Sequence, residues 1–127
     1  MGDNRDESVP FDRSTRLEKP QQLSNDKIYQ GLASTRRRRL LYVLREETEC
    51  TVDHLADILT EWEDANGNPS PDDHKKVRIK LVHSDLPLLA DAELIAYDRE
   101  NELVRAEPLH PLFDAVISRS IDAEAAP

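Results

Sequence analysis

The sequence predicts a mainly α-helical fold with one small β-hairpin. Three observations lead to this prediction. Apolar residues recur at helical spacing in five segments, helix-start signals precede several of them, and two short strand-like segments near residue 100 are separated by turn residues. We expect a disordered N-terminal tail over residues 1–22, one domain over 23–107, a C-terminal helix over 108–122 and a disordered end over 123–127.

Two helices are predicted in the first part of the domain. Ser24 or Asn25 can cap a helix whose apolar side holds Ile28 and Leu32, four residues apart. The pattern restarts at Ser34 or Thr35, and leucines and a valine between residues 40 and 44 form the apolar side of a second helix that ends near residues 47–49.

A third and a fourth helix follow, each with a recognisable start. Thr51 can cap an amphipathic helix whose apolar residues fall at positions 0, 3, 4, 7 and 10: Val52, Leu55, Ala56, Leu59 and Trp62. Ser70 and Pro71, followed by two aspartates, form a strong start signal for the next helix. That helix should be buried on two sides and run to about Asp85, and Pro87 should kink or break it. One buried side would hold Ile79, Val82, Leu86 and Leu89, and the other Val77, Leu81 and Leu88.

The chain then predicts a hairpin and a last helix. Residues 95–97 read as a strand, 98–101 as a turn in which Asn101 tolerates a left-handed conformation, and 103–106 as the returning strand. Beyond Pro108 and Pro111, five apolar residues at helical spacing predict an amphipathic helix and a candidate dimer surface, although packing on its own domain explains them equally well: Leu112, Phe113, Val116, Ile117 and Ile121.

This order of elements is typical of a winged helix-turn-helix, in which the helix before the hairpin enters the major groove of DNA. On the predicted fourth helix, Lys76, Lys80 and His83 fall on one arc and would read the DNA, while Lys75 and Arg78 would contact flanking phosphates. Arg99 would lie at the tip of the hairpin. The alternative is a solvated helix face whose cations pair with nearby aspartates.

Four consecutive arginines, Arg36 to Arg39, open the second predicted helix. Successive residues point all round a helix axis, so the four cannot face one partner. Arg38 is expected on the solvent side with Arg45, where it could hold a phosphate. One or two of the four could hold phosphates in this way, and the rest would bind acidic groups within the protein.

The charge of the chain points to a particular kind of environment. Asp and Glu number 26 against 17 Lys and Arg, for a formal net charge of −9. Such a surface suits molar intracellular salt, where the Debye length is about 3 Å and repulsion between acids is screened. We therefore expect a halophilic protein, with an ordinary acidic protein as the alternative.

Several function classes find no support in the sequence. We see no membrane span and no secretory leader, and the single cysteine, Cys50, fits a reducing cytoplasm. Cys50 and His54 are four residues apart, but soft metals need several thiolates, so no metal or other cofactor is expected. The chain lacks a phosphate-binding glycine loop and a nucleophile elbow, and we do not expect an enzyme.

Two segments carry a resemblance to known proteins. Residues 32–41 resemble the L-S-N-x-R-R-R-x-x-L opening of haloarchaeal winged-helix domains distantly similar to ArsR-type repressors, and residues 86–98 are similar to their H-L-P-x-L-x-x-x-G-x-V-x-Y-D end. The resemblance spans about residues 24–107 and implies a DNA-binding regulator. Glu93 stands where that pattern has glycine, so a left-handed turn there would be strained. The loop between Glu63 and Ser70 is also longer than a minimal turn.

Two hypotheses for function follow. The first is a transcriptional regulator that binds double-stranded DNA as a homodimer in high salt. The second is a winged-helix adaptor that binds other proteins and has lost DNA binding. Acidic side chains crossing the exposed side of the fourth helix would favour the adaptor.

Overall fold

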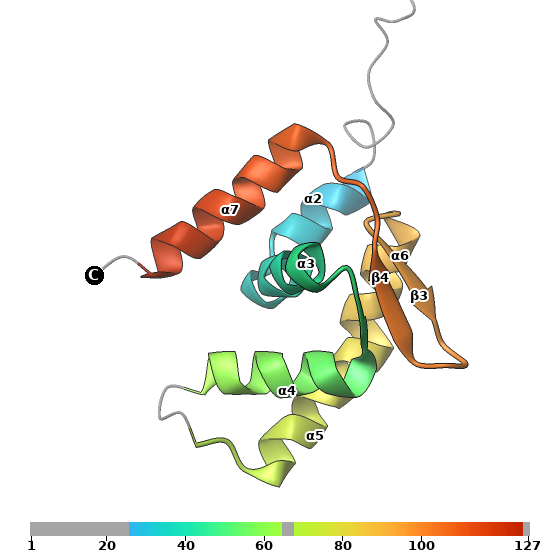
Figure 1. Ribbon diagram of the computed structural model, residues 1–127, viewed down its shortest axis with the longest axis vertical. Helices are drawn as coiled ribbons and strands as arrows, with labels where there is room; N and C mark the ends of the chain where they lie inside the picture. Colours follow the sequence, from blue (N-terminus) through green and yellow to red (C-terminus); the bar gives the residue numbers. More distant parts are fainter. Residues whose placement is uncertain (1–25, 65–67, 126–127) are drawn as a thin grey trace, which may run out of the picture.

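Helices make up most of the chain, and a small antiparallel sheet lies beside them (Figure 1). The structure is a computed structural model and describes residues 26–64 and 68–125. In chain order the elements are α2 (Asp26–Leu32), α3 (Thr35–Glu47), β2 (Glu49–Thr51), α4 (Val52–Glu63), α5 (Pro71–Lys80), η1 (Leu81–Asp85), α6 (Leu86–Asp91), β3 (Ile95–Asp98), β4 (Leu103–Ala106) and α7 (Pro111–Ala125). This mainly helical arrangement with its hairpin is compatible with a winged helix-turn-helix, as predicted.

Local capping interactions start three of the helices where the sequence predicts. The hydroxyls of Ser34, Thr51 and Ser70 each accept a hydrogen bond from the backbone N–H three residues later. Asp73 completes a capping box by accepting from the N–H of Ser70 at 3.0 Å. Each cap satisfies a backbone donor that the first turn of a helix leaves free. The expected cap of α2, Ser24 or Asn25, lies outside the described residues.

The kink or break predicted at Pro87 is not a break: the helix changes to a π-helical turn just before the proline and then continues. α5, η1 and α6 form one continuous helical path to Asp91, with a π-helical turn at its centre (Figure 1). In this turn the N–H of Leu86 donates to the carbonyl of Leu81, five residues back. In a regular α-helix the proline ring meets the carbonyl four residues earlier. The wider turn before Pro87 alters that contact and allows the helix to continue.

The sheet contains a strand that the sequence prediction missed. The strand order is β2-β4-β3, all antiparallel, with Cys50 opposite Val104 and Tyr97 opposite Val104 on the other side. The sequence predicts the end of a helix near residues 47–49 and a helix cap at Thr51, with no strand between them. Such a three-residue strand has no periodicity of its own and forms because β4 offers it a partner.

The hairpin between β3 and β4 agrees with the prediction except in its turn. The left-handed residue is Glu102, with φ 53°, and not Asn101. Asn101 instead donates from its backbone N–H and its side-chain amide to the carboxylate of Asp98. These bonds hold the start of the turn and leave the left-handed position to the next residue.

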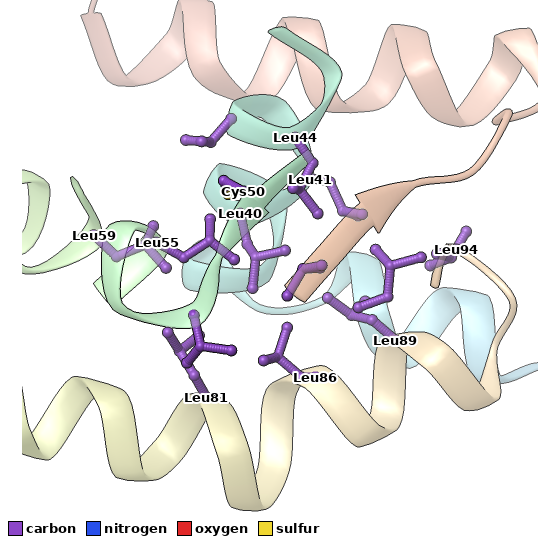
Figure 2. Packing of buried hydrophobic residues seen from close by; sticks show 14 of the residues in the cluster. Leu40, Leu41, Leu44, Cys50, Leu55, Leu59, Leu81, Leu86, Leu89 and Leu94 are labelled. Atoms are coloured by element: carbon purple, nitrogen blue, oxygen red, sulfur yellow. The ribbon is translucent and has the colours of Figure 1, made fainter. Parts of the chain in front are cut away.

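The hydrophobic core lies where α3, α4, the α5–α6 helix and β4 meet (Figure 2). Its largest fully buried side chains are Ile28, Leu40, Leu44, Leu55, Leu59, Leu81, Leu86, Leu89, Leu94, Ile117, Val52 and Val104. Gly31 lets α2 approach this core closely, because a Cβ there would lie 2.9 Å from Cδ2 of Leu89. The α5–α6 helix is thus anchored along one side, which fixes the direction of its exposed side.

The C-terminal helix extends further than predicted. α7 continues to Ala125, whereas the sequence predicted a disordered end from residue 123. An ion pair between Glu124 and Arg39, 2.9 Å long, connects the last turn to α3. The tail predicted over residues 1–22 lies outside the described residues. Within residues 26–64 and 68–125, no helix has the length and apolar character to cross a membrane.

Candidate nucleic-acid interface

One side of the α5–η1 segment is exposed and mostly cationic. Lys75, Lys76, Ile79, Lys80 and His83 are all exposed, at positions that repeat every four residues. We call these five residues the reading face. Three of them, Lys76, Lys80 and His83, are the residues predicted to read DNA from this side of the helix, and Lys75 is one of the two predicted flanking phosphate contacts.

Ile79 is on the reading face contrary to the prediction that it is buried. Its exposed fraction is 49%, whereas Val77 and Leu81 are buried on the opposite side of the helix. At 100° per residue, Ile79 lies about 200° from Val77, so a helix that buries Val77 turns Ile79 towards solvent. The helix is therefore buried along one stripe here rather than on two sides.

Lys75 and Lys80 differ from Lys76 in their surroundings. Lys76 lies 3.3 Å from Asp72 in an exposed pair one helical turn apart, which contributes little to stability. Among the described residues, neither Lys75 nor Lys80 has an acidic partner within ion-pair distance. These two ammonium groups are available to an external anion without any internal contact being broken.

Arg78, expected to contact phosphate, is instead bound within the protein. Its guanidinium donates to Asp53 of α4 and to Glu102 of the hairpin turn, each at 2.7 Å. Hydrogen bonds to Glu102 and then to Asp53 raise the pKa of Arg78. The residue joins α4, α5 and the hairpin, and thereby sets the position of the hairpin relative to the reading face.

The tip of the hairpin carries Arg99, as predicted. This exposed guanidinium lies over the ring of Tyr97, 5.7 Å from its centre. Beside it, hydrogen bonds from Asn101 lower the pKa of Asp98 and keep that carboxylate ionised. The tip thus offers one exposed arginine next to a fixed negative charge.

The arginine run connects elements of the protein. Arg36 makes two hydrogen bonds to Glu63, of 2.6 and 2.8 Å, and Arg37 donates to the buried Asp85 at 3.0 Å. The bonds to Glu63 are the main reason that the pKa of Arg36 is raised. Asp85, 5% exposed, therefore faces two arginines of α3, and its Oδ2 lies 3.7 Å from Arg36.

Arg38 and Arg39 are also held inside the structure. Arg38 donates to the carbonyl of Leu32, to Ser120 and to Thr35. The prediction that Arg38 faces solvent and holds a phosphate does not agree with this position, since α7 covers it. Arg39 pairs with Glu124 and stacks over Trp62 at 5.0 Å. The run thus links α3 to α2, α4, η1 and α7.

Acidic side chains lie close to the reading face on one side. A hollow of about 380 Å³ between α4 and α5 is lined by Glu63, Asp64 and Asp73 together with Lys76 and Lys80. Hydrogen bonds to Ser70 lower the pKa of Asp73, so its charge is fixed by the helix start. Cations and acids therefore alternate across this edge of the face.

Cys50 is buried, whereas His54, four residues later, is exposed. The Cys50 thiol is buried, and burial raises its pKa to about 11. His54 lies 3.3 Å from Glu47. No group of three or more potential metal ligands occurs in the part of the chain that the structure describes.

The candidate dimer residues separate into two sets. Phe113 and Ile117 are buried within the chain and are closed to a second copy, and Ile121 is half-buried. Leu112 and Val116 are 58% and 45% exposed. Of these five residues, the exposed pair is the part that a second copy could contact.

Comparison with known proteins gives a family but no relative of known activity. A search of the curated proteins and a search of the solved structures each found no match. Residues 29–105 match a family described as a domain of unknown function (DUF7344). This span begins in α2 and ends in β4, so it contains the reading face and the hairpin, and the chain belongs to this family.

Proposed function

We propose that this protein is a transcriptional regulator that binds double-stranded DNA through the reading face and the tip of the hairpin. The observation that carries the proposal is the exposure of Lys75, Lys76, Ile79, Lys80 and His83 together on the helix that precedes the hairpin. In a winged helix-turn-helix this helix enters the major groove. Arg99 would contact the DNA backbone from the hairpin tip.

The salt concentration determines which contacts with DNA contribute to the affinity. Each phosphate neutralised contributes about −0.9 to the slope of log affinity against log salt. Three lysines therefore lose roughly 500-fold in affinity between 0.2 M and 2 M salt. The acidic composition suits a haloarchaeal cytoplasm of molar salt. There, hydrogen bonds and apolar contacts with base edges would supply the affinity, and the net charge of −9 would suppress non-specific binding.

The proposal includes a homodimer formed through α7. Leu112 and Val116 lie one turn apart and are exposed, as an apolar contact between two copies requires. Sedimentation should give a dimer for the intact chain and a monomer after Leu112→Glu with Val116→Glu. Ile79→Glu, which changes an equally exposed apolar residue elsewhere, should leave the dimer intact.

The test of DNA binding is selection from a random-sequence duplex library in 2 M KCl. Its variant replaces Lys75, Lys76 and Lys80 by alanine. The matched control replaces Lys27, Arg105 and Arg119, which are exposed on α2, β4 and α7 and lower the net charge by the same amount. We expect the intact chain and the control to enrich the same sequences and the reading-face variant to enrich none. Equal loss in both variants would point to net charge and not to the reading face.

The acids beside the reading face favour a second candidate, a protein-binding adaptor. Glu63, Asp64 and Asp73 share a hollow with two of the lysines, and such alternation of charges suits a polar protein surface better than a phosphate backbone. If the intact, folded chain enriches no duplex at 2 M or at 0.2 M KCl, the adaptor becomes the better explanation.

A further inference from the structure

The apolar member of the reading face lies among its cations. Ile79 is followed directly by Lys80, and Lys75 and Lys76 lie one turn before it. The other large apolar side chains that are markedly exposed in the described chain, Leu112, Val116 and Tyr29, belong to α7 and α2. Ile79 is therefore isolated from them, with lysines of the reading face before and after it in the helix and acidic side chains along one edge of that face. A surface of this kind is complementary to a polyanion that also presents an apolar group.

We infer that Ile79 determines sequence specificity by contacting the 5-methyl group of a thymine in the major groove, an inference that rests on the proposed function. The thymine methyl is the apolar group that the major groove displays, and aliphatic side chains recognise it.

Helix geometry indicates what should flank this thymine. Lys76 and Lys75 precede Ile79 by three and four residues, or about 4.5 and 6 Å along the axis. Base pairs are about 3.4 Å apart, so the lysines reach positions within about two base pairs of the thymine. Lysine recognises guanine through O6 and N7. The preferred site should therefore combine a thymine with a guanine one or two base pairs away.

The contact with the thymine methyl group would supply a larger share of the total binding free energy in high salt than in low salt. Screening removes the lysine–phosphate contribution, whereas burial of a methyl group does not depend on counterion release. One buried methyl group changes affinity about fourfold. Loss of the thymine methyl should therefore weaken binding about fourfold at 0.2 M and at 2 M KCl alike.

The experiment uses duplexes recovered from the random library in 2 M KCl. Each thymine is replaced in turn by deoxyuridine, which lacks only the 5-methyl group, and affinity is measured for the full chain and for Ile79→Ala. We expect a roughly fourfold loss at one or two positions for the intact chain and no loss there for Ile79→Ala. The control His83→Ala should keep the loss. Circular dichroism confirms that each variant is folded.

The outcomes separate this inference from the proposed function. If duplexes are enriched but every deoxyuridine substitution leaves affinity unchanged, the thymine contact is wrong and the regulator stands. The thymine contact of Ile79 is also wrong, and the regulator again stands, if deoxyuridine weakens the binding of Ile79→Ala as much as that of the intact chain. Another residue would then contact the methyl group. If no duplex is enriched, both fall, and Ile79 becomes part of a surface for a protein.

Discussion

Replacing Glu93 by glycine should stabilise the protein, although it removes a side chain. Glu93 has φ 62° and ends α6 in the left-handed conformation. Its N–H donates to Ala90 and that of Leu94 to Leu89, each at 3.0 Å, the hydrogen-bond pattern of a Schellman motif. Leu94 and Leu89 are both buried, so the apolar contact typical of the motif is also present. Glycine is the residue that this position ordinarily holds.

The expected gain follows from two opposing effects. The left-handed conformation costs an L-residue about 1–2 kcal/mol, which glycine avoids. Glycine also lowers the free energy of unfolding by about 0.4–1 kcal/mol, because it increases the conformational entropy of the unfolded chain. The side chain of Glu93 is exposed, and the described residues include no ion pair to it. The net gain should be about 0.5–1 kcal/mol, or about 2–6 °C in Tm.

Thermal and denaturant unfolding in constant salt measure this gain, with Glu93→Ala as the control. Alanine removes the same charge and the same side chain but keeps the Cβ that strains the backbone. We expect Glu93→Ala to be close to wild type or slightly less stable. If Glu93→Ala stabilises as much as Glu93→Gly, relief of acidic repulsion and not of backbone strain is responsible, and the reasoning fails.

Three further predictions concern charge. Replacing Lys75, Lys76 and Lys80 by alanine should flatten the salt dependence of DNA affinity by up to about 2.7 in the log–log slope, and by less where a lysine contacts guanine instead of phosphate. Titration between 0.2 M and 2 M KCl measures the slope, and an unchanged slope would mean that none of the three contacts phosphate. Arg78→Ala should lower stability by about 1 kcal/mol through its two exposed pairs but leave that slope unaltered, and a flatter slope would mean that it binds phosphate after all. The raised pKa of Cys50 means that the folded state holds this proton more tightly than the unfolded state, so stability should be full below pH 9 and fall between about pH 9 and 11. Cys50→Ala should lose this dependence in pH-resolved denaturation, and a slope that persists would assign it to other groups.

Features that depend on neighbours in sequence were predictable. Ser34, Thr51 and Ser70 cap their helices through backbone groups three residues away, so residue type and position suffice. The strands of the hairpin follow the same logic, since their partners adjoin in sequence. The prediction failed where the partner is distant: β2 exists because β4 pairs with it, some fifty residues later.

In the candidate site, too, the features that depend on near neighbours in sequence were predictable and those that depend on distant partners were not. Helical periodicity correctly grouped Lys76, Lys80 and His83 on an exposed face, because that grouping depends only on the angle between residues. It could not show that Arg78 is taken by Asp53 and Glu102, which lie on separate elements. Nor could it show that Ile79 is exposed, since that depends on which apolar stripe packs against α4.

Arginine and lysine have different roles in this chain, and the difference bears on function. Each arginine of the run from Arg36 to Arg39 bonds to groups in other elements, and Arg78 bridges two more. A guanidinium has five donors in a fixed plane and suits such bridging, whereas an ammonium is a mobile point charge. The reading face carries lysines instead, and these would break fewer bonds within the protein on binding a ligand. The four consecutive arginines, the most conspicuous cations in the sequence, therefore connect the elements of the fold, and the cations proposed to contact a partner are the lysines around Ile79 and Arg99 at the hairpin tip.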